Sequence, residues 1–170
     1  MTEAEITAAF GQHKDAVYRF AWRMTRSPSA AEDIAQEVFL SLLTHPERFR
    51  GERGTLRAFL LGTARNISLK RWREQNRWDP LEDHDFVAQP LDPEGQEIGE
   101  YVAGAIALLP LLQRETLILA EYEGLTLEEI AHAVHAEVGT VKSRLHRARE
   151  NLRRMLAPLK PVNRSCTWNR

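Results

Sequence analysis

A cluster of cationic and hydroxyl side chains between residues 140 and 147 carries the clearest chemical signal in the sequence. Its members are Thr140, Lys142, Ser143, Arg144, His146 and Arg147. Arginine pairs bidentately with the major-groove edge of guanine, serine bonds to several bases, and lysine and arginine neutralise phosphates. These residue types predict a contact with duplex DNA, and Lys142, Ser143 and Arg147 are its strongest candidates.

Two helices joined by a tight turn are needed to position this cluster. Thr126 and Glu129 have the spacing of a capping box, which predicts that a helix begins after Thr126. A second helix with a basic outer face is predicted by the apolar stripe Val141, Leu145, Ala148, Leu152 and Met155. The turn between them is expected to contain Gly139, and His135 stands where a left-handed residue is expected. Such a helix-turn-helix places its second helix in the DNA major groove, although a solvated basic helix is the alternative interpretation.

The charges are segregated along the chain, although the formal net charge is only −1. Arginine and lysine dominate residues 48–77, whereas acids but no arginine or lysine occur in residues 79–100. Two basic blocks separated by an acidic one indicate two DNA-facing surfaces and a linker.

Almost every periodic segment predicts a helix, and no strand pattern is evident, so the expected fold class is all-α. The helices expected before the helix-turn-helix are Ile6–Met24, a helix capped by Ser29 and Glu32 that stops at His45-Pro46, Thr55–Asn76, one from Ile98 to about Pro110, and Gln113–Tyr122. With 170 residues, the chain is long enough for two small helical domains. The expected division is a first domain at 1–77, a flexible acidic linker at 78–97, a second domain at 98–157 and an irregular tail at 158–170.

Enzymatic chemistry is not expected. The sequence contains no glycine-rich phosphate loop and no Ser-His-Asp or Cys-His arrangement in a suitable setting, and its six histidines share no ligand spacing. No metal or other cofactor is predicted. Cys166 is the only cysteine, which excludes an internal disulfide and is typical of a surface thiol in a reducing compartment. The longest apolar run, at 102–112, is too short to span a bilayer, so a cytoplasmic protein without membrane insertion is expected.

The two halves together resemble bacterial sigma factors of the extracytoplasmic-function type, also called group IV. The resemblance covers about residues 10–156 and is carried by AEDIAQEVFLSLL, FRGERGTLRAFLLGTARN, LPLLQRETLILAEYEGLTLEEIA and VGTVKSRLHRARENL. It implies a sigma region 2 helical bundle followed by a sigma region 4 helix-turn-helix domain of four helices. It also implies an alternative sigma factor that binds the clamp coiled coil and flap of core RNA polymerase. Promoter DNA and an anti-sigma factor are its other implied partners.

Three groups of residues match the functional positions of that family. Asp33, Gln36 and Glu37 match the surface that meets the polymerase clamp, although the residues alone favour a solvated helix face. The positions that match the reader of the minus-ten element are Arg50, Arg53, Arg65, Asn66, Lys70 and Arg73. Those that match the recognition helix for the minus-thirty-five element are Thr140, Lys142, Ser143, Arg144, His146 and Arg147.

Some features of the minus-ten reader stay open at this level. Lys70 stands where many relatives have aspartate, which leaves the base preference undefined. Trp72 or Trp78 offers a stacking surface for a base, although a tryptophan near a helix end more often covers the core. The alternative function is a helix-turn-helix regulator that binds duplex DNA without a sigma role. The basic block in the first half argues against that alternative, because a sensor domain does not need it.

Overall fold

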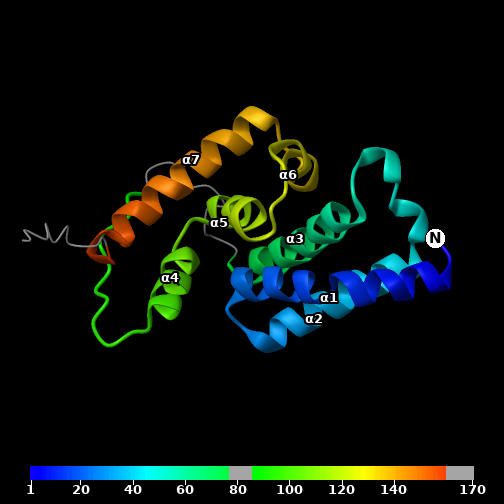
Figure 1. Ribbon diagram of the computed structural model, residues 1–170, viewed down its shortest axis with the longest axis horizontal. Coiled ribbons are helices and arrows are strands. Elements are labelled where there is room, and N and C mark those ends of the chain that lie inside the picture. Colours follow the sequence, from blue (N-terminus) through cyan, green and yellow to red (C-terminus); the bar gives the residue numbers. More distant parts are fainter. Residues whose placement is uncertain (77–85, 160–170) are drawn as a thin grey trace, which may run out of the picture.

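The structure is a computed structural model that describes residues 1–76 and 86–159. The expected linker residues 78–85, with Trp78, and the tail residues 160–170, with Cys166, lie outside the described residues. The longer helices are α1 (Glu3–Thr25), α2 (Pro28–Thr44), α3 (Leu56–Gln75), α4 (Ile98–Ala107), α5 (Leu111–Leu117), α6 (Leu127–Val134) and α7 (Val138–Met155) (Figure 1). Short turns are η1 (Pro46–Arg48), η2 (Gly51–Arg53), the π-helical η3 (Ile118–Tyr122) and η4 (Ala157–Leu159). The described part of the chain consists of helices joined by loops and has no strand, which confirms the all-α prediction.

Helices α1, α2 and α3 form the first domain and share an apolar core. Phe20, Ile34 and Leu61 contribute one fully buried side chain from each helix. The start of α2 differs from the sequence prediction, because its N-cap is Ser27 rather than Ser29. Pro28 is suited to the first helical position, where no amide donor is needed, and the Ser27 hydroxyl accepts the amide of Ala30 at 3.3 Å.

Helices α4 to α7 form the second domain, and α6 with α7 makes the predicted helix-turn-helix. The capping box is confirmed, since the Thr126 hydroxyl accepts the Glu129 amide and the Glu129 carboxylate accepts the Thr126 amide. His135 has φ 53° and ψ 48°, which confirms the left-handed conformation expected there. The expected position of Gly139 in the turn was wrong. It lies in the first turn of α7, because that helix already begins at Val138.

Replacing His135 with glycine is expected to raise the free energy of unfolding by about 0.5 kcal/mol. A left-handed conformation strains a residue with a Cβ, and the greater freedom of glycine in the unfolded chain offsets part of the gain. Denaturant unfolding measures the difference, and His132→Gly, inside the last turn of α6, is the control and should cost about 1 kcal/mol. A loss of stability in the His135 variant would contradict the assignment of strain to this residue.

Residues 86–91 pack along α7, although they belong to the predicted linker. The Leu91 amide donates to the Met155 carbonyl at 3.0 Å. The Tyr101 hydroxyl lies 2.8 Å from the Leu91 carbonyl oxygen and 2.9 Å from that of Met155. The second packed unit therefore includes residues before the expected boundary at 98.

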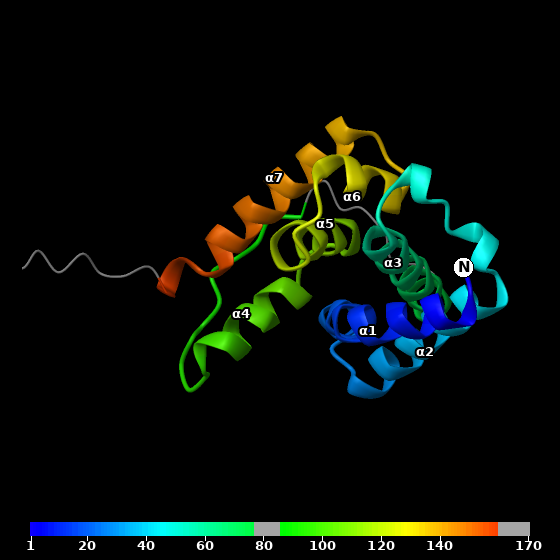
Figure 2. The same ribbon diagram turned by 45° about the vertical axis from the view of Figure 1, so that its right-hand side comes forward.

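The two domains pack against each other through α3. Figure 2 shows α3 between α1 of its own domain and α6 of the second domain. Gly62 makes this close approach possible, since a Cβ at that position would lie 3.3 Å from the Cβ of Ala133.

Within the described ranges no helix is long and apolar enough to cross a bilayer.

Candidate nucleic-acid and polymerase interfaces

The predicted recognition residues lie in the first half of α7. Val141, Leu145 and Ala148 are buried and fix this helix against the rest of the second domain. Lys142, Ser143 and His146 are exposed, and the remaining members of the cluster, Thr140, Arg144 and Arg147, are half-buried. The Ser143 hydroxyl donates to the Thr140 carbonyl at 3.0 Å, which leaves its oxygen able to accept from a base. The structure thus brings this group together on one helix, as a contact with a DNA groove requires.

The second half of α7 is basic too, but acidic side chains compensate its arginines. Arg149 binds Glu121 through two nitrogens at 2.9 and 2.5 Å, and Arg153 contacts Glu150. These pairs lower the positive charge available at the C-terminal end of the helix.

Asp33, Gln36 and Glu37 form an exposed polar face on α2. Ile34 and Val38 lie on the opposite, buried side and hold the helix in place. Sequence reasoning missed Arg71 of α3, whose guanidinium lies 3.6 Å from the Asp33 carboxylate and 3.3 Å from that of Glu37. A partner that binds this face must therefore compete with Arg71 or include it.

Three of the predicted minus-ten residues line one cavity between the domains. Arg50, Arg53 and Asn66 surround a volume of about 210 Å³, and its other side is lined by His132 of α6 and by His135, which directly follows that helix. Neither histidine was expected near this group, because both belong to the second domain. The cavity combines cations, an amide and apolar surface, which suits a nucleotide base with its phosphate.

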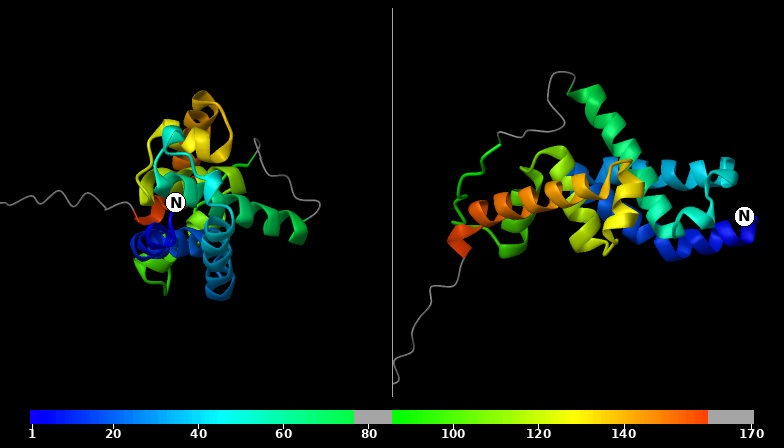
Figure 3. Two further views of the ribbon diagram at one scale, coloured as in Figure 1. Left: turned by 90° about the vertical axis from the view of Figure 1, so that its right-hand side faces the viewer. Right: turned by 90° about the horizontal axis from the view of Figure 1, so that it is seen from above.

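Lys70 and Arg73 are exposed farther along α3. Figure 3 shows that the C-terminal half of this helix projects beyond the neighbouring helices. Trp72 on this segment packs partly buried against the core, so its side chain has the covering role that the sequence favoured. The two cations thus extend the basic surface away from the cavity.

Arg65 differs from the other predicted minus-ten residues because it is buried, although its guanidinium donates to the Asn66 amide oxygen at 3.1 Å. Its side chain is buried and binds Glu115 of α5 bidentately, with N–O distances of 2.7 and 2.9 Å. Burial raises the pKa of Glu115, and Arg65 is the first of the groups that oppose this shift. In this arrangement Arg65 does not face solvent, and whether it ever contacts DNA stays a prediction.

Comparison with known proteins matches two segments of the chain to two families. Residues 9–78 match the Sigma-70 region 2 family and residues 99–152 match Sigma-70, region 4. The ECF RNA polymerase sigma factor SigL of Mycobacterium tuberculosis is 30% identical over 161 residues, which cover 92% of this chain and 91% of SigL. This chain belongs to the extracytoplasmic-function sigma factors.

Other relatives of this sigma factor show the same family likeness. SigE of Mycolicibacterium smegmatis is 35% identical over 154 residues, which cover 86% of this chain but only 59% of SigE. Among solved structures, RpoE of Bartonella quintana, in complex with the anti-sigma factor NepR, superposes with a TM-score of 0.73 at 25% identity. That match covers 94% of this chain and 99% of RpoE. CnrH, in complex with the cytosolic domain of CnrY, has the same fold, with a TM-score of 0.67 at 21% identity.

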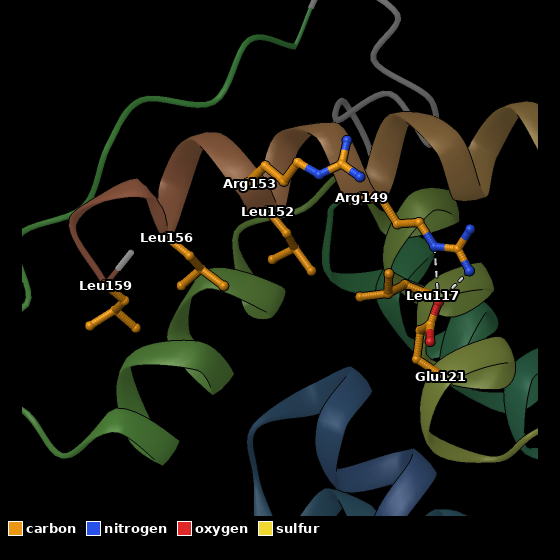
Figure 4. Close-up of a pocket in the computed structure, with 7 residues that line it drawn as sticks. All are labelled: Leu117, Glu121, Arg149, Leu152, Arg153, Leu156 and Leu159. Atoms are coloured by element: carbon orange, nitrogen blue, oxygen red, sulfur yellow. Dashed lines mark hydrogen bonds and ion pairs between the residues drawn. The ribbon is translucent and has the colours of Figure 1, made fainter. Parts of the chain in front are cut away.

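An apolar groove of about 460 Å³ lies beside α7 of the sigma factor (Figure 4). Leu117, Leu152, Leu156 and Leu159 line it, and Glu121, Arg149 and Arg153 form its polar rim. Leu152 follows Ser143 by nine residues, which is about half a turn more than two full turns of an α-helix. Leu152 in the groove and Ser143 in the recognition cluster therefore lie on opposite sides of α7. In the described residues no group of three or more His, Cys, Asp or Glu is arranged to hold a metal ion.

Proposed function

We propose that this sigma factor binds core RNA polymerase in the cytoplasm and directs it to promoters. The first domain reads the minus-ten element, and the second domain reads the minus-thirty-five element. The observation that carries this proposal is the presence of both sigma regions in one chain. The named relatives are sigma factors, a class of proteins without catalytic activity of their own.

The first half of α7 reads the minus-thirty-five element as duplex in this proposal. Lys142, Ser143 and Arg147 make the base contacts, and the other members of the cluster contact bases or phosphates. The amino-terminal end of α7 adds a positive dipole toward the DNA backbone. A single module of this size has a small interface, roughly 600–1,000 Å², so the second domain alone should bind weakly.

The minus-ten element is opened and captured at the first domain. Flipping a base from the stack costs a few kcal/mol, and contact with a pocket must return that energy. The exposed amide of Asn66 offers a donor and an acceptor to a base edge, while Arg50 and Arg53 lie where they can hold its phosphate. Lys70 and Arg73 continue along the projecting end of α3, where they follow the separated strand.

Two surfaces serve polymerase in this proposal. The acidic and amide face at Asp33, Gln36 and Glu37 meets the clamp coiled coil, because complementary charge steers and orients such contacts. The apolar groove beside α7 receives an amphipathic helix of the polymerase flap, in the helix-in-groove mode. Flap and DNA bind the second domain together in this proposal, with Leu152 of the groove on the opposite side of α7 from Ser143.

We further propose that an anti-sigma factor regulates this chain. The support comes from RpoE of Bartonella quintana, which was solved with the anti-sigma factor NepR and has the same fold over nearly its whole length. The partner of this chain must cover the polymerase face or a DNA surface to inhibit it.

Transcription with purified components tests the proposal. Core polymerase with this chain should initiate at defined sites on a library of promoter fragments, whereas core polymerase without it should not. No gain over core polymerase across the library would contradict a sigma role. Tight binding of the free protein to operators with two-fold symmetry would instead support a helix-turn-helix regulator.

A further inference from the structure

Glu115 is a fully buried acid at the contact between the two domains. It belongs to α5 of the second domain, but both of its carboxylate oxygens accept hydrogen bonds from Arg65 of α3. Arg65 itself is only 8% exposed, and its remaining terminal nitrogen donates to the Asn66 amide oxygen at 3.1 Å. The ion pair therefore joins two domains that the sequence predicts to be linked flexibly.

Glu115 lies within electrostatic reach of further arginines that are proposed to bind DNA. Burial raises the pKa of this carboxyl, while Arg65, Arg144 and Arg73 each favour its charged form. Arg65 and Arg73 belong to the minus-ten set, and Arg144 belongs to the recognition helix. The buried Glu115 carboxylate thus lies near arginines from both proposed DNA-binding surfaces.

Other contacts across the same interface are also polar. Arg57 of α3 donates to the buried carboxylate of Glu123 at 2.6 Å and to its carbonyl at 3.2 Å. The Thr55 hydroxyl donates to Glu129 at 3.1 Å. Close packing of α3 against α6, at Gly62 and Ala133, adds an apolar component at this place.

An interface built this way can be separated by a competing anion. A buried ion pair gives little net stability, because the desolvation of both charges offsets their attraction. When the domains part, water hydrates Glu115, and a DNA phosphate or base edge can take its place on Arg65. An apolar contact of the same size would lack this sensitivity to a polyanion.

Resting on the proposed function, we propose that the Arg65–Glu115 pair holds the free sigma factor in a closed arrangement that withholds Arg65 from the minus-ten element. Glu115 and promoter DNA are then mutually exclusive partners of Arg65. In the closed arrangement α6 also lines the cavity at Arg50, Arg53 and Asn66, so entry of a base requires α6 to move. Opening of the domains is therefore part of promoter recognition.

The distance between the domains tests the closed arrangement. Spin labels at Gly11→Cys on α1 and Arg154→Cys on α7, in a Cys166→Ser background, report it in the full chain. Glu115→Gln removes the charge of the pair, and Gly62→Leu separates α3 from α6 without altering any charge. Both variants should lengthen or broaden the distance distribution, whereas Glu128→Gln, an exposed acid on α6, should leave it unchanged. Unchanged distances in both test variants overturn the proposal.

Binding of a single-stranded minus-ten oligonucleotide by the free protein tests the competition. Glu115→Gln and Gly62→Leu should each gain on the order of tenfold in affinity, as is typical of coupling between sites. The double variant Arg65→Met with Glu115→Gln should open to the same extent without that gain. An equal gain in the double variant overturns the assignment of Arg65 as the released contact.

Transcription with core polymerase distinguishes a failure of the proposed competition from a failure of the proposed function. Opening without any gain in DNA affinity, in a protein that still directs transcription, overturns the proposed competition. Absence of promoter-specific transcription in the wild-type chain contradicts the proposed function, while a change in domain distance would still support the closed arrangement.

Discussion

Replacing Glu37 with lysine is expected to weaken the association of the sigma factor with core polymerase by about 100-fold or more. A like-charge contact in an interface costs several kcal/mol, and each 1.4 kcal/mol is about a factor of ten in affinity. The new lysine also faces Arg71, which now lies 3.3 Å from the Glu37 carboxylate. The fold should survive, because an exposed ion pair contributes at most about 1 kcal/mol to stability.

Asp15→Lys is the matched control for this change. Asp15 is exposed on α1, and its replacement alters the net charge by the same amount on a different face. Competition binding to core polymerase, with thermal unfolding measured in parallel, gives the comparison. Equal losses in both variants would mean that net charge matters rather than the α2 face, and no loss in the Glu37 variant would remove this residue from the interface.

Replacing Arg147 with alanine is expected to cost about 1–3 kcal/mol in promoter binding when its base partner is guanine. The arginine lies half-buried on α7, where Leu145 and Ala148 on either side are buried and fix the direction of the helix. Affinities of the reconstituted holoenzyme for every single-base variant of the minus-thirty-five element measure the effect. The loss of affinity should occur only on promoters that carry, at one position of the minus-thirty-five element, the base that Arg147 prefers.

Arg154→Ala controls for the loss of one positive charge from the same helix. Arg154 is exposed in the last turn of α7, beyond the recognition cluster. Its replacement should lower affinity slightly and to the same extent for all sequences. If Arg147→Ala behaves in the same uniform way, Arg147 contacts phosphate and does not read a base.

Local sequence signals predicted the helix-turn-helix well. The capping box at Thr126 and Glu129 and the left-handed residue His135 depend on neighbours within a few positions, so spacing was sufficient to find them. The shift of one cap from Ser29 to Ser27 is also local. There the preference of proline for the first helical position outweighed the spacing of the expected pair.

The contact between the domains could not be read from local patterns, since Arg65 and Glu115 are 50 residues apart. A weaker signal was nevertheless present in the sequence. Arg65 stands four residues from Leu61 and from Leu69, both buried, so it interrupts an apolar stripe. Glu115 stands in the same relation to Leu111 and Leu119. One charged residue in each of two apolar stripes, with opposite signs, indicates a buried ion pair. The pattern does not show in advance which helices pair.

Helix α2 also carries exposed apolar residues. Leu40 and Leu43 are 59% and 52% exposed, and Leu40 follows Glu37 on the outer side of the helix. The predicted buried side of this helix, Ile34, Val38, Phe39 and Leu42, does not include them. Their position extends the proposed clamp surface with an apolar edge.

Selection of promoters from a fully randomised DNA library by the reconstituted holoenzyme tests the central claim most directly. Two domains that read separate elements should enrich two sequence blocks at a fixed spacing. Arg147→Ala should alter only the upstream block, and Asn66→Ala should alter only the downstream block. Enrichment of a single block, or of a two-fold symmetric site that the free protein selects equally well, would contradict the claim that both domains read one promoter together.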